Sequence, residues 1–220
     1  MHAYCAVIER IVVAALGDSI TAGSPGWDPD PDVRARIAAA DPQSQWEHWA
    51  ALADPRLQFR NHGVYGERTE EIAARLDRAV AGARVLIVQG GINDIAQRRP
   101  IEPAADQLRT MVRRGVGLGL ATALADVLPW NSGWPDAEAA IRRLNELVRE
   151  IGAAEKVPVL PFHDTLEDEA RPGRMRDDWT SDGDHPSVAG YRRLGELVAS
   201  ELAGLVWTVT EWSRHSGLSF

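Results

Sequence analysis

Short apolar runs alternate along this chain with longer segments of helical period, and this alternation restricts the fold more than any other feature. The apolar runs lie at 11–16, 57–61, 85–89, 119–127 and 157–161. Each run is nearly continuous, as expected of strands that are buried on both faces of a sheet. Apolar strands that alternate with helices predict an α/β domain built on a parallel sheet of five strands.

Segments of helical period lie between these runs. Two sets of apolar residues have the spacing of one helix face: Ile141, Leu144, Val148 and Ile151, and Tyr191, Leu194, Val198 and Leu202. The first set predicts a helix that begins near Asp136, and the second predicts a helix with Ser187 as its N-cap. Thr69 is the expected cap of another helix that runs to about Val80. The C-terminal tail, residues 206–220, fits no element well, so we expect an edge segment or a loosely held tail.

Length, charge and cysteine content narrow the class of protein. The 220 residues suit a single domain, which we expect to span 1–220. Lys and Arg total 24 against 32 Asp and Glu, giving a net charge of -8, whereas nucleic acids and anionic membranes select clustered cations. The single cysteine, Cys5, cannot form an internal disulfide, a cysteine-based zinc site or a CxxC redox pair. We therefore expect no nucleic-acid partner and no disulfide framework.

The sequence shows no convincing signal for export or membrane insertion. Residues 1–8 carry no Lys or Arg, and the apolar run at 11–16 is followed at once by a polar turn. The stretch 116–124 contains glycines and is far shorter than the ~20 residues of a membrane-spanning helix. We expect no membrane span and a cytoplasmic location.

The functional loops of a parallel α/β sheet lie at the carboxyl ends of its strands. Residues 17–20, Gly-Asp-Ser-Ile, directly follow the first predicted strand. A serine in such a strand-to-helix turn, here Ser19, is exposed, fixed and close to backbone N–H groups, as a nucleophile must be. The same residues also make a good helix-capping turn, so this motif alone does not establish a catalytic serine.

The next two strands also end in polar motifs that contain glycine. Residues 61–69 read Asn-His-Gly-Val-Tyr-Gly-Glu-Arg-Thr, in which Gly66 can present its N–H at the same edge as Ser19. Residues 90–94 read Gly-Gly-Ile-Asn-Asp, and the side-chain amide of Asn93 is a neutral donor for an oxyanion. The structural alternatives are glycines that permit a positive φ in a turn and an asparagine that bonds its own loop.

A fourth motif stands before the last predicted helix. Residues 181–186 read Ser-Asp-Gly-Asp-His-Pro. A carboxylate three residues before a histidine, Asp182 before His185, can reach Nδ1 and leave Nε2 as a general base. In isolation, a loop Asp and His are more often solvated surface groups. The four motifs together supply a nucleophile, two further oxyanion donors and a base with its orienting acid.

This order of motifs resembles the SGNH hydrolases, also called the GDSL esterase/lipase superfamily, whose blocks are named for Ser, Gly, Asn and His. The resemblance runs from Gly17 to the helix after His185. It implies a three-layer α/β/α fold with a flavodoxin-like, five-stranded parallel sheet. It also implies that Ser19, Asp182 and His185 form a catalytic triad. Asp184 is the rival acid, but it fits the Asp-x-x-His spacing of the family less well than Asp182.

The resemblance further implies an oxyanion hole. Its donors are the backbone N–H groups of Ser19 and Gly66 and the side chain of Asn93. Gly63 competes with Gly66 for this role, and Gly66 is preferred because it stands closer to the predicted helix start. The activity implied is a two-step acyl transfer through an acyl-enzyme, without a metal or a cofactor.

Four other classes of protein fit the motifs less well. An α/β-hydrolase would carry Gly-x-Ser-x-Gly, but Thr21 stands two residues after Ser19. A metal-dependent phosphoesterase needs several converging ligands, whereas the six histidines are scattered singly. A flavin- or nucleotide-binding domain would carry a glycine run after the first strand. The remaining alternative is a catalytically silent ligand-binding protein on the same fold.

The expected substrates are small-molecule, short-chain carboxylic esters. No long insertion can act as a lid, and no extended apolar stretch suggests a deep acyl tunnel. The resemblance also admits carbohydrate O-acetyl esterases, thioesterases and lysophospholipases, so the family alone does not select the substrate.

Tryptophan is over-represented, with eight Trp against three Phe and three Tyr. Four tryptophans lie in predicted loops at the functional edge, and we expect them to wall the substrate pocket: Trp27, Trp130, Trp134 and Trp179. Trp46 and Trp49, three residues apart, are expected to share one buried helix stripe. The alternative is that all eight are packing residues.

Overall fold

The computed structural model describes residues 10–23 and 41–216 and contains a sheet of five strands in which every pairing is parallel. The strands are β1 (Ile11–Gly17), β2 (Leu57–Gly63), β3 (Val85–Val88), β4 (Ala121–Ala125) and β5 (Val159–Leu160). Their order across the sheet is β2-β1-β3-β4-β5. The five predicted strands are confirmed, although β4 and β5 are shorter than the apolar runs at 119–127 and 157–161.

The strand order places a crevice at the carboxyl end of β1. This strand pairs with β2 on one side and β3 on the other, so the direction of winding reverses there. In open α/β sheets, ligands bind outside the carboxyl ends of the strands at such a reversal. Every residue of β1 except Val12 is buried, because this strand has neighbours on both sides and helices on both faces.

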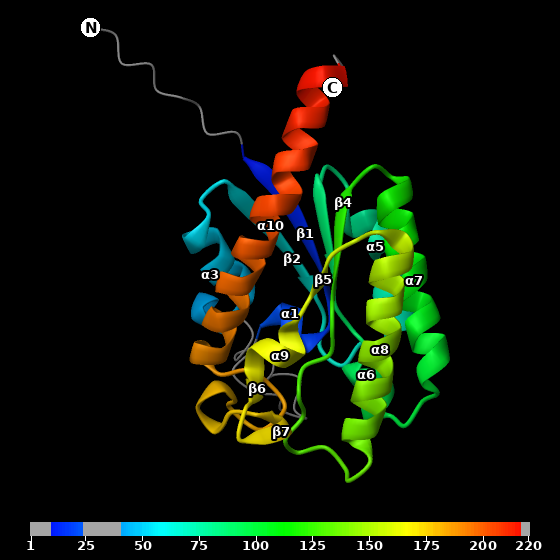
Figure 1. Ribbon diagram of the computed structural model, residues 1–220, viewed down its shortest axis with the longest axis vertical. Helices are drawn as coiled ribbons and strands as arrows, with labels where there is room; N and C mark the ends of the chain where they lie inside the picture. The colour runs from blue at the N-terminus through cyan, green and yellow to red at the C-terminus, as the bar shows by residue number, and fades with distance from the viewer. Residues whose placement is uncertain (1–9, 24–40, 217–220) are drawn as a thin grey trace, which may run out of the picture.

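Helices cover both faces of the sheet and complete three layers (Figure 1). One face carries α3 (Trp46–Ala53), α9 (Phe162–Leu166) and α10 (Val188–Ser216). The opposite face carries α4 (Thr69–Ala74), α5 (Leu76–Ala79), α6 (Ile92–Ala96), α7 (Ile101–Gly117) and α8 (Ala137–Glu155). Each face has its own apolar core, so the sheet is the shared middle layer.

Trp46 anchors the core between α3 and the sheet. Its side chain is fully buried and packs edge-on against Phe59 of β2 and Phe162 of α9, with ring centroids 5.6 and 6.0 Å apart. Trp49, one helical turn later, is partly buried against the same core. The predicted helix stripe is confirmed, and removing a buried aromatic side chain of this kind costs about 3–5 kcal/mol of stability.

The predicted helix starts are confirmed with one exception. Asp136 is the N-cap of α8, and Ser187 Oγ accepts a backbone hydrogen bond at 3.3 Å at the start of α10. Thr69 is instead the first residue of α4, which has Arg68 as its N-cap. The helix predicted from Thr69 to about Val80 is divided at Arg75 into α4 and α5.

The last helix extends further than predicted. Residues 206–216 continue α10 to Ser216, so the prediction that the tail fits no regular element is wrong for this part of the chain. The segment 205–215 contains neither Gly nor Pro, so nothing in it breaks the helix.

Within the described residues, no helix combines the length and apolarity needed to cross a membrane.

Short elements gather at the carboxyl edge of the sheet (Figure 1). They are α1 (Ser19–Ala22), β6 (Glu167–Asp168), β7 (Arg171–Met175) and two 3-10 turns, η1 (Pro42–Ser44) and η2 (Asp177–Trp179). Strands β6 and β7 pair as a small antiparallel sheet that was not predicted. Asn131, after β4, bonds both backbone groups of Met175 in β7, at 2.7 and 2.8 Å. This contact fixes the loop after β4 against the segment that leads to His185.

Candidate active site

Ser19 lies in a tight turn between β1 and α1. The Oδ1 atom of Asp18, the N-cap of α1, accepts a hydrogen bond from the backbone N–H of Ile20 at 2.9 Å. Gly17 leaves no room for a side chain, because a Cβ there would lie 2.3 Å from Thr21 Oγ1. Ser19 is therefore fixed as the first residue of α1, where a backbone N–H has no partner within the helix.

The loop before α10 brings a histidine and a carboxylate to Ser19. His185 Nε2 lies 3.1 Å from Ser19 Oγ, and His185 Nδ1 lies 2.8 Å from Asp182 Oδ2. The second carboxylate oxygen, Oδ1, accepts backbone N–H groups of Asp184 and His185 at 2.8 and 2.7 Å. Both oxygens of Asp182 are thus engaged, and the imidazole is held between an acid and a hydroxyl.

The electrostatics of Asp182 suit this arrangement. Burial acts to raise the pKa of Asp182, but the hydrogen bonds and charge of His185 outweigh it and lower the pKa to about 2. Asp182 is therefore ionised at neutral pH. An ionised carboxylate at Nδ1 fixes the histidine tautomer that leaves Nε2 free to accept a proton.

Asp184 makes its side-chain hydrogen bond to Trp130 and none to His185 within the described residues. Its Oδ1 atom accepts a hydrogen bond from Trp130 Nε1 at 2.5 Å. Burial raises the pKa of Asp184, in contrast to the lowered pKa of Asp182. Of the two rival carboxylates, the structure places Asp182 against His185 Nδ1.

Asn93 and Gly66 line the same small cavity as Ser19. Asn93, in α6, donates one Nδ2 hydrogen bond to the carbonyl of Glu67 at 2.9 Å, which leaves a second amide hydrogen. Gly66 has a φ of +75°, and a Cβ at this position would meet no atom within 4 Å. The backbone of Gly66 therefore borders open space, as an oxyanion donor requires.

The rival glycine, Gly63, is placed differently. A Cβ at Gly63 would lie 2.0 Å from the backbone nitrogen of Ala22, so this glycine permits close packing of β2 against α1. Its own N–H donates to Asn61 Oδ1 at 2.8 Å. Gly63 therefore serves the packing of β2 against α1, and its N–H already has a hydrogen-bond partner. Gly66 is the glycine that lines the cavity.

The cavity at Ser19 has a volume of about 270 Å³ and a polar lining. Its described lining residues are Ser19, Gly66, Asn93, Gln97, Asp184 and His185. Gln97, at the end of α6, was not predicted at the site, and Asp184 was considered only as the rival acid of the triad. Among the described lining residues there is no tryptophan.

The four predicted pocket tryptophans have different positions. Trp130 and Trp134 pack edge to face with centroids 5.1 Å apart, and Trp130 reaches the cavity only through its hydrogen bond to Asp184. Trp179 lines a separate cavity of about 450 Å³, where Arg176 and Arg193 lie over its ring at 4.2 and 5.1 Å. The expectation that Trp179 walls the pocket of Ser19 is thus corrected, and Trp27 lies outside the described residues.

Arg75 ties together three segments that build the site. Its guanidinium donates to the carbonyl of Gly17 at 3.2 Å, to the carbonyl of His62 at 2.9 Å and to the carboxylate of Glu67. These acceptors lie at the end of β1, at the end of β2 and in the loop that contains Gly66. Since Asn93 donates to the carbonyl of Glu67, one network links the turn of Ser19 to Asn93 and to the loop of Gly66.

Asp94 makes a second connection behind the site. Its carboxylate accepts the backbone N–H of Thr69 at 2.9 Å and the hydroxyl of Thr69 at 3.1 Å. The start of α4 is thereby joined to the start of α6, next to Asn93. Neither Arg75 nor Asp94 was predicted to support the site, because both contacts depend on how distant strands pack.

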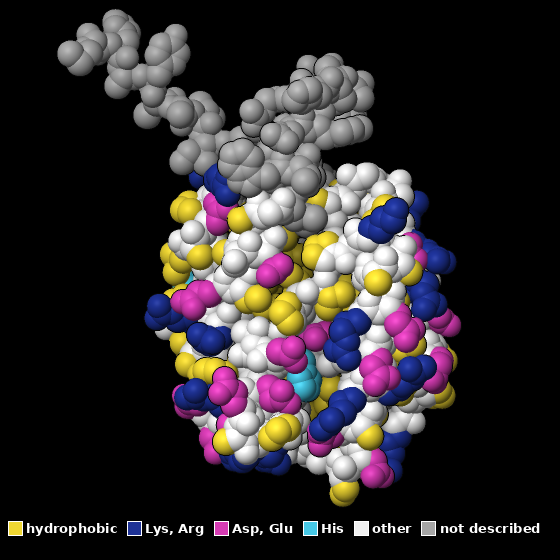
Figure 2. All heavy atoms as spheres, in the orientation of Figure 1, with side chains coloured by type: hydrophobic (Ala, Val, Ile, Leu, Met, Phe, Trp, Pro, Cys, Tyr) yellow, Lys and Arg dark blue, Asp and Glu magenta, His cyan; other side chains and the backbone are white. Residues whose placement is uncertain are grey.

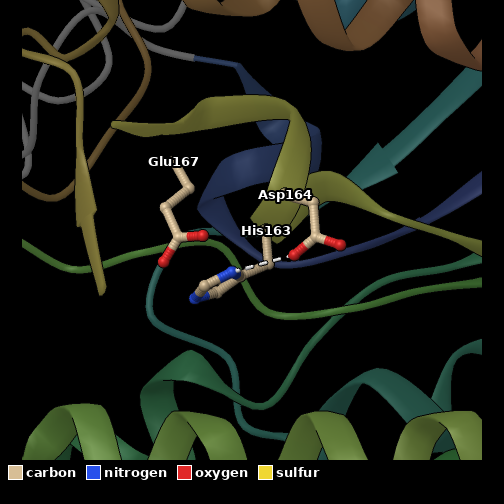
Figure 3. A group of neighbouring side chains, drawn as sticks. All are labelled: His163, Asp164 and Glu167. Carbon is tan, nitrogen blue, oxygen red and sulfur yellow. Dashed lines mark ion pairs between the residues drawn. The ribbon is translucent and has the colours of Figure 1, made fainter. Parts of the chain in front are cut away.

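A further polar cluster lies outside this cavity. Ligand-type atoms of His163, Asp164 and Glu167 lie within 4.8 Å of one another, with His163 Nδ1 3.4 Å from Asp164 (Figure 3). Figure 2 shows several acidic side chains on the face of the molecule that is turned toward the viewer. Asp164 is largely exposed, and none of the three residues lines the cavity of Ser19. The cluster is separate from the arrangement of Ser19, His185 and Asp182.

Known proteins resemble this chain in sequence pattern and in fold. The profile of the GDSL-like Lipase/Acylhydrolase family matches residues 15–193. A search of curated protein sequences finds no significant match.

Solved structures share the fold of this chain. A G-D-S-L family lipolytic protein from Desulfitobacterium hafniense has a TM-score of 0.72 and 20% identity over 87% of this chain and 99% of its own. A lipase/acylhydrolase from Enterococcus faecalis has a TM-score of 0.66 and 23% identity over 89% and 96%. A mutant of Axe2, an acetyl-xylooligosaccharide esterase from Geobacillus Stearmophilus, has a TM-score of 0.69 and 15% identity over 88% and 94%.

The match to the family profile covers most of the chain, and its range, 15–193, includes the residues of all four motifs. The five-stranded parallel sheet has the architecture of the G-D-S-L structures. The chain therefore belongs to the GDSL-like lipase/acylhydrolase family of ester-hydrolysing enzymes, within the SGNH hydrolase superfamily.

Proposed function

We propose that this protein is a serine esterase that hydrolyses short-chain carboxylic esters through a Ser-His-Asp triad and an acyl-enzyme intermediate. The observation that carries the proposal is the continuous line of hydrogen bonds from Asp182 through His185 to Ser19, at 2.8 and 3.1 Å, which ends at a small cavity. A serine next to an oriented histidine is an activated nucleophile.

In the first half-reaction, Ser19 Oγ attacks the ester carbonyl carbon while His185 Nε2 takes the hydroxyl proton. The ionised Asp182 stabilises the imidazolium that forms. The tetrahedral intermediate then expels the alcohol, which leaves with the proton from His185. The product is an ester between Ser19 and the acyl group.

In the second half-reaction, water attacks the acyl-enzyme, and His185 again takes and returns the proton. In both steps the negative charge on the former carbonyl oxygen is held by the N–H groups of Ser19 and Gly66 and by the Asn93 amide. Fixed donors of this type act on charge that develops in the transition state, so they accelerate the reaction.

The size and polarity of the cavity support small substrates. A volume of about 270 Å³ suits a short acyl group together with part of its alcohol. A second candidate function is hydrolysis of acetyl groups from carbohydrates. It is favoured by the polar lining and by the fold shared with an acetyl-xylooligosaccharide esterase.

The test is hydrolysis of p-nitrophenyl esters of increasing acyl length and of acetylated sugars, by the wild type and by Ser19→Ala. We expect turnover to fall steeply with acyl length, to be lost in Ser19→Ala and to survive EDTA. Ser200→Ala is the matched control, because Ser200 is exposed on α10. Wild-type rates in Ser19→Ala, or loss of activity with EDTA, would contradict a metal-independent serine esterase.

A further inference from the structure

The cavity at Ser19 contains a carboxylate that the proposed reaction does not use. Asp184 is the one acidic side chain among the described lining residues, and none of those residues is Lys or Arg. The charged groups that bear most on it are Asp182, which raises the pKa of Asp184, and His185, which lowers it. Asp182 already belongs to His185, so Asp184 has no cationic partner of its own in this part of the structure.

The position of Asp184 is fixed on both sides. Its Oδ1 accepts from Trp130 Nε1, and the backbone N–H of Asn131 donates to the carbonyl of Gly183 at 2.7 Å. Its backbone N–H donates to Asp182 Oδ1 at 2.8 Å. Within the described residues, Oδ2 makes no hydrogen bond. The carboxylate therefore keeps one acceptor oxygen available.

Binding of an ester must cover this carboxylate, at least in part. Removing a charge from water without a partner is costly, and a cation removes much of that cost. A neutral substrate would leave the Asp184 charge uncompensated, and an anionic substrate would add repulsion. Two opposite unit charges about 4 Å apart attract each other several times more strongly near a protein surface than in bulk water.

We propose that Asp184 selects esters that carry a positive charge close to the ester group, such as esters of ammonium alcohols. This inference rests on the proposed esterase activity and names the substrate class of the same cavity. Asp184 acts here as a specificity residue, because it lies against the substrate and not against His185 Nδ1. Its effect is a preference between substrates, which separates it from a general effect on the triad.

The test compares acetylcholine with its uncharged isostere, in which a carbon atom replaces the quaternary nitrogen. The two esters have the same shape, so the ratio of their kcat/KM values measures the effect of charge. We expect the ratio to favour the cation in the wild type and to fall about tenfold in Asp184→Asn at low salt and slightly alkaline pH. Asn retains an oxygen that accepts from Trp130, so this variant preserves the loop contact.

Two controls separate a local effect from other causes. Asp106→Asn makes the same change in net charge on α7, at an exposed side chain that does not line the cavity, and its ratio should equal that of the wild type. Inhibition of the wild type by choline, compared with the matching uncharged alcohol, gives a measurement that does not depend on any variant. Choline should inhibit at lower concentration.

The outcomes are distinguishable. The selection of cations would be overturned if the ratio of kcat/KM values for acetylcholine and its isostere were equal in the wild type and Asp184→Asn. Equal inhibition by choline and the uncharged alcohol would also overturn it. The same two proteins are also compared on ethylene glycol monoacetate and propyl acetate, of which only the first carries a hydroxyl group. If Asp184→Asn loses only the preference for the hydroxylated ester, Asp184 accepts a hydrogen bond from a hydroxyl group, and the selection of cations is overturned. Ester hydrolysis that is lost in Ser19→Ala supports the esterase in each of these cases, whereas no hydrolysis of any ester would remove both proposals.

Discussion

His185 Nε2 lies 3.1 Å from Ser19 Oγ, although the two residues are 166 positions apart in the chain. The contact forms because β1 ends at the reversal of strand order, while the loop before α10 returns to the same edge of the sheet. Backbone hydrogen bonds between Ser181 and His185 and between Trp179 and Ser187, at 3.0 and 2.8 Å, close this loop. The approach of His185 to Ser19 is thus a consequence of the sheet topology and of one hydrogen-bonded loop.

Asn93→Ala should lower kcat by roughly 10²–10³-fold, with a smaller effect on KM, because the lost donor acts mainly on the transition state. The measurement is steady-state hydrolysis of a short-chain ester. Asn93 also bonds the carbonyl of Glu67, so the thermal unfolding of the variant must be compared with that of the wild type. A change in KM alone would contradict its place in the oxyanion hole.

Asp182→Asn should reduce kcat by about 10⁴-fold, since the amide can present the wrong hydrogen-bonding group to His185 Nδ1. The pKa of Asp182 is about 2, so the carboxylate stays ionised through the working range. The titration of Asp182 itself should therefore add no step to the ratio of wild-type to variant rates between about pH 5 and 9. If Asp184→Asn showed this loss and Asp182→Asn did not, the acid of the triad would be Asp184.

Arg75→Met should lower kcat by roughly tenfold to 10²-fold, because the turn of Ser19 and the Gly66 loop lose their common partner. If Arg75 acted only on stability, Arg75→Met would lower the stability of the fold, and its effect on kcat would be independent of the effect of Asn93→Ala. The double variant with Asn93→Ala separates these cases. We expect its loss to be smaller than the product of the single losses, since both residues act through the loop at Glu67. Fully multiplicative effects would contradict the positioning role.

Asp126→Asn should remove part of the dependence of stability on pH. Burial raises the pKa of Asp126 from 3.8 to about 7 in the folded protein, and Asp126 Oδ1 accepts the backbone N–H of His163 at 2.8 Å. The folded state holds this proton more tightly than the unfolded chain. The resulting stability is fully present below the unfolded pKa near 3.8 and is lost as the pH rises through about 7.

The free energy of unfolding of Asp126→Asn should therefore equal that of the wild type near pH 4. Near pH 8 the variant should be more stable, by about 1.4 kcal/mol for each unit between the unfolded and folded pKa values of Asp126. Urea unfolding at several pH values measures this difference. Burial also raises the pKa of Asp18 to about 6, so the variant will keep a weaker dependence of the same sign. A wild type that gains stability relative to Asp126→Asn between these pH values would contradict the assignment.

The parts of the structure that follow from short-range chemistry were predictable from sequence. The buried strands have continuous apolar runs, and the turn at Gly17 and the spacing of Asp182 and His185 each lie within a few residues. The small sheet of β6 and β7 was not predictable in the same way, because its strands, Glu-Asp and Arg-Pro-Gly-Arg-Met, have low β-propensity.

The missed parts of the site depend on contacts between distant segments. Arg75 reaches the carbonyl of Gly17 across 58 positions of the chain, and Trp130 reaches Asp184 across 54. Trp179 precedes Asp182 by three residues, yet its ring contacts Arg176 and Arg193 in another cavity. The position of Trp179 in the sequence, close to Asp182, therefore did not reveal which cavity its ring lines.

Labelling with a fluorophosphonate tests the activation of Ser19 most directly, because a fluorophosphonate reacts with an activated serine and needs no knowledge of the substrate. Intact-mass analysis of the wild type should show one adduct, and peptide mapping should place it on Ser19. Ser19→Ala should show none, and Asp182→Asn should react far more slowly. An unlabelled wild type, or an adduct that persists in Ser19→Ala, would contradict the assignment of Ser19 as the nucleophile.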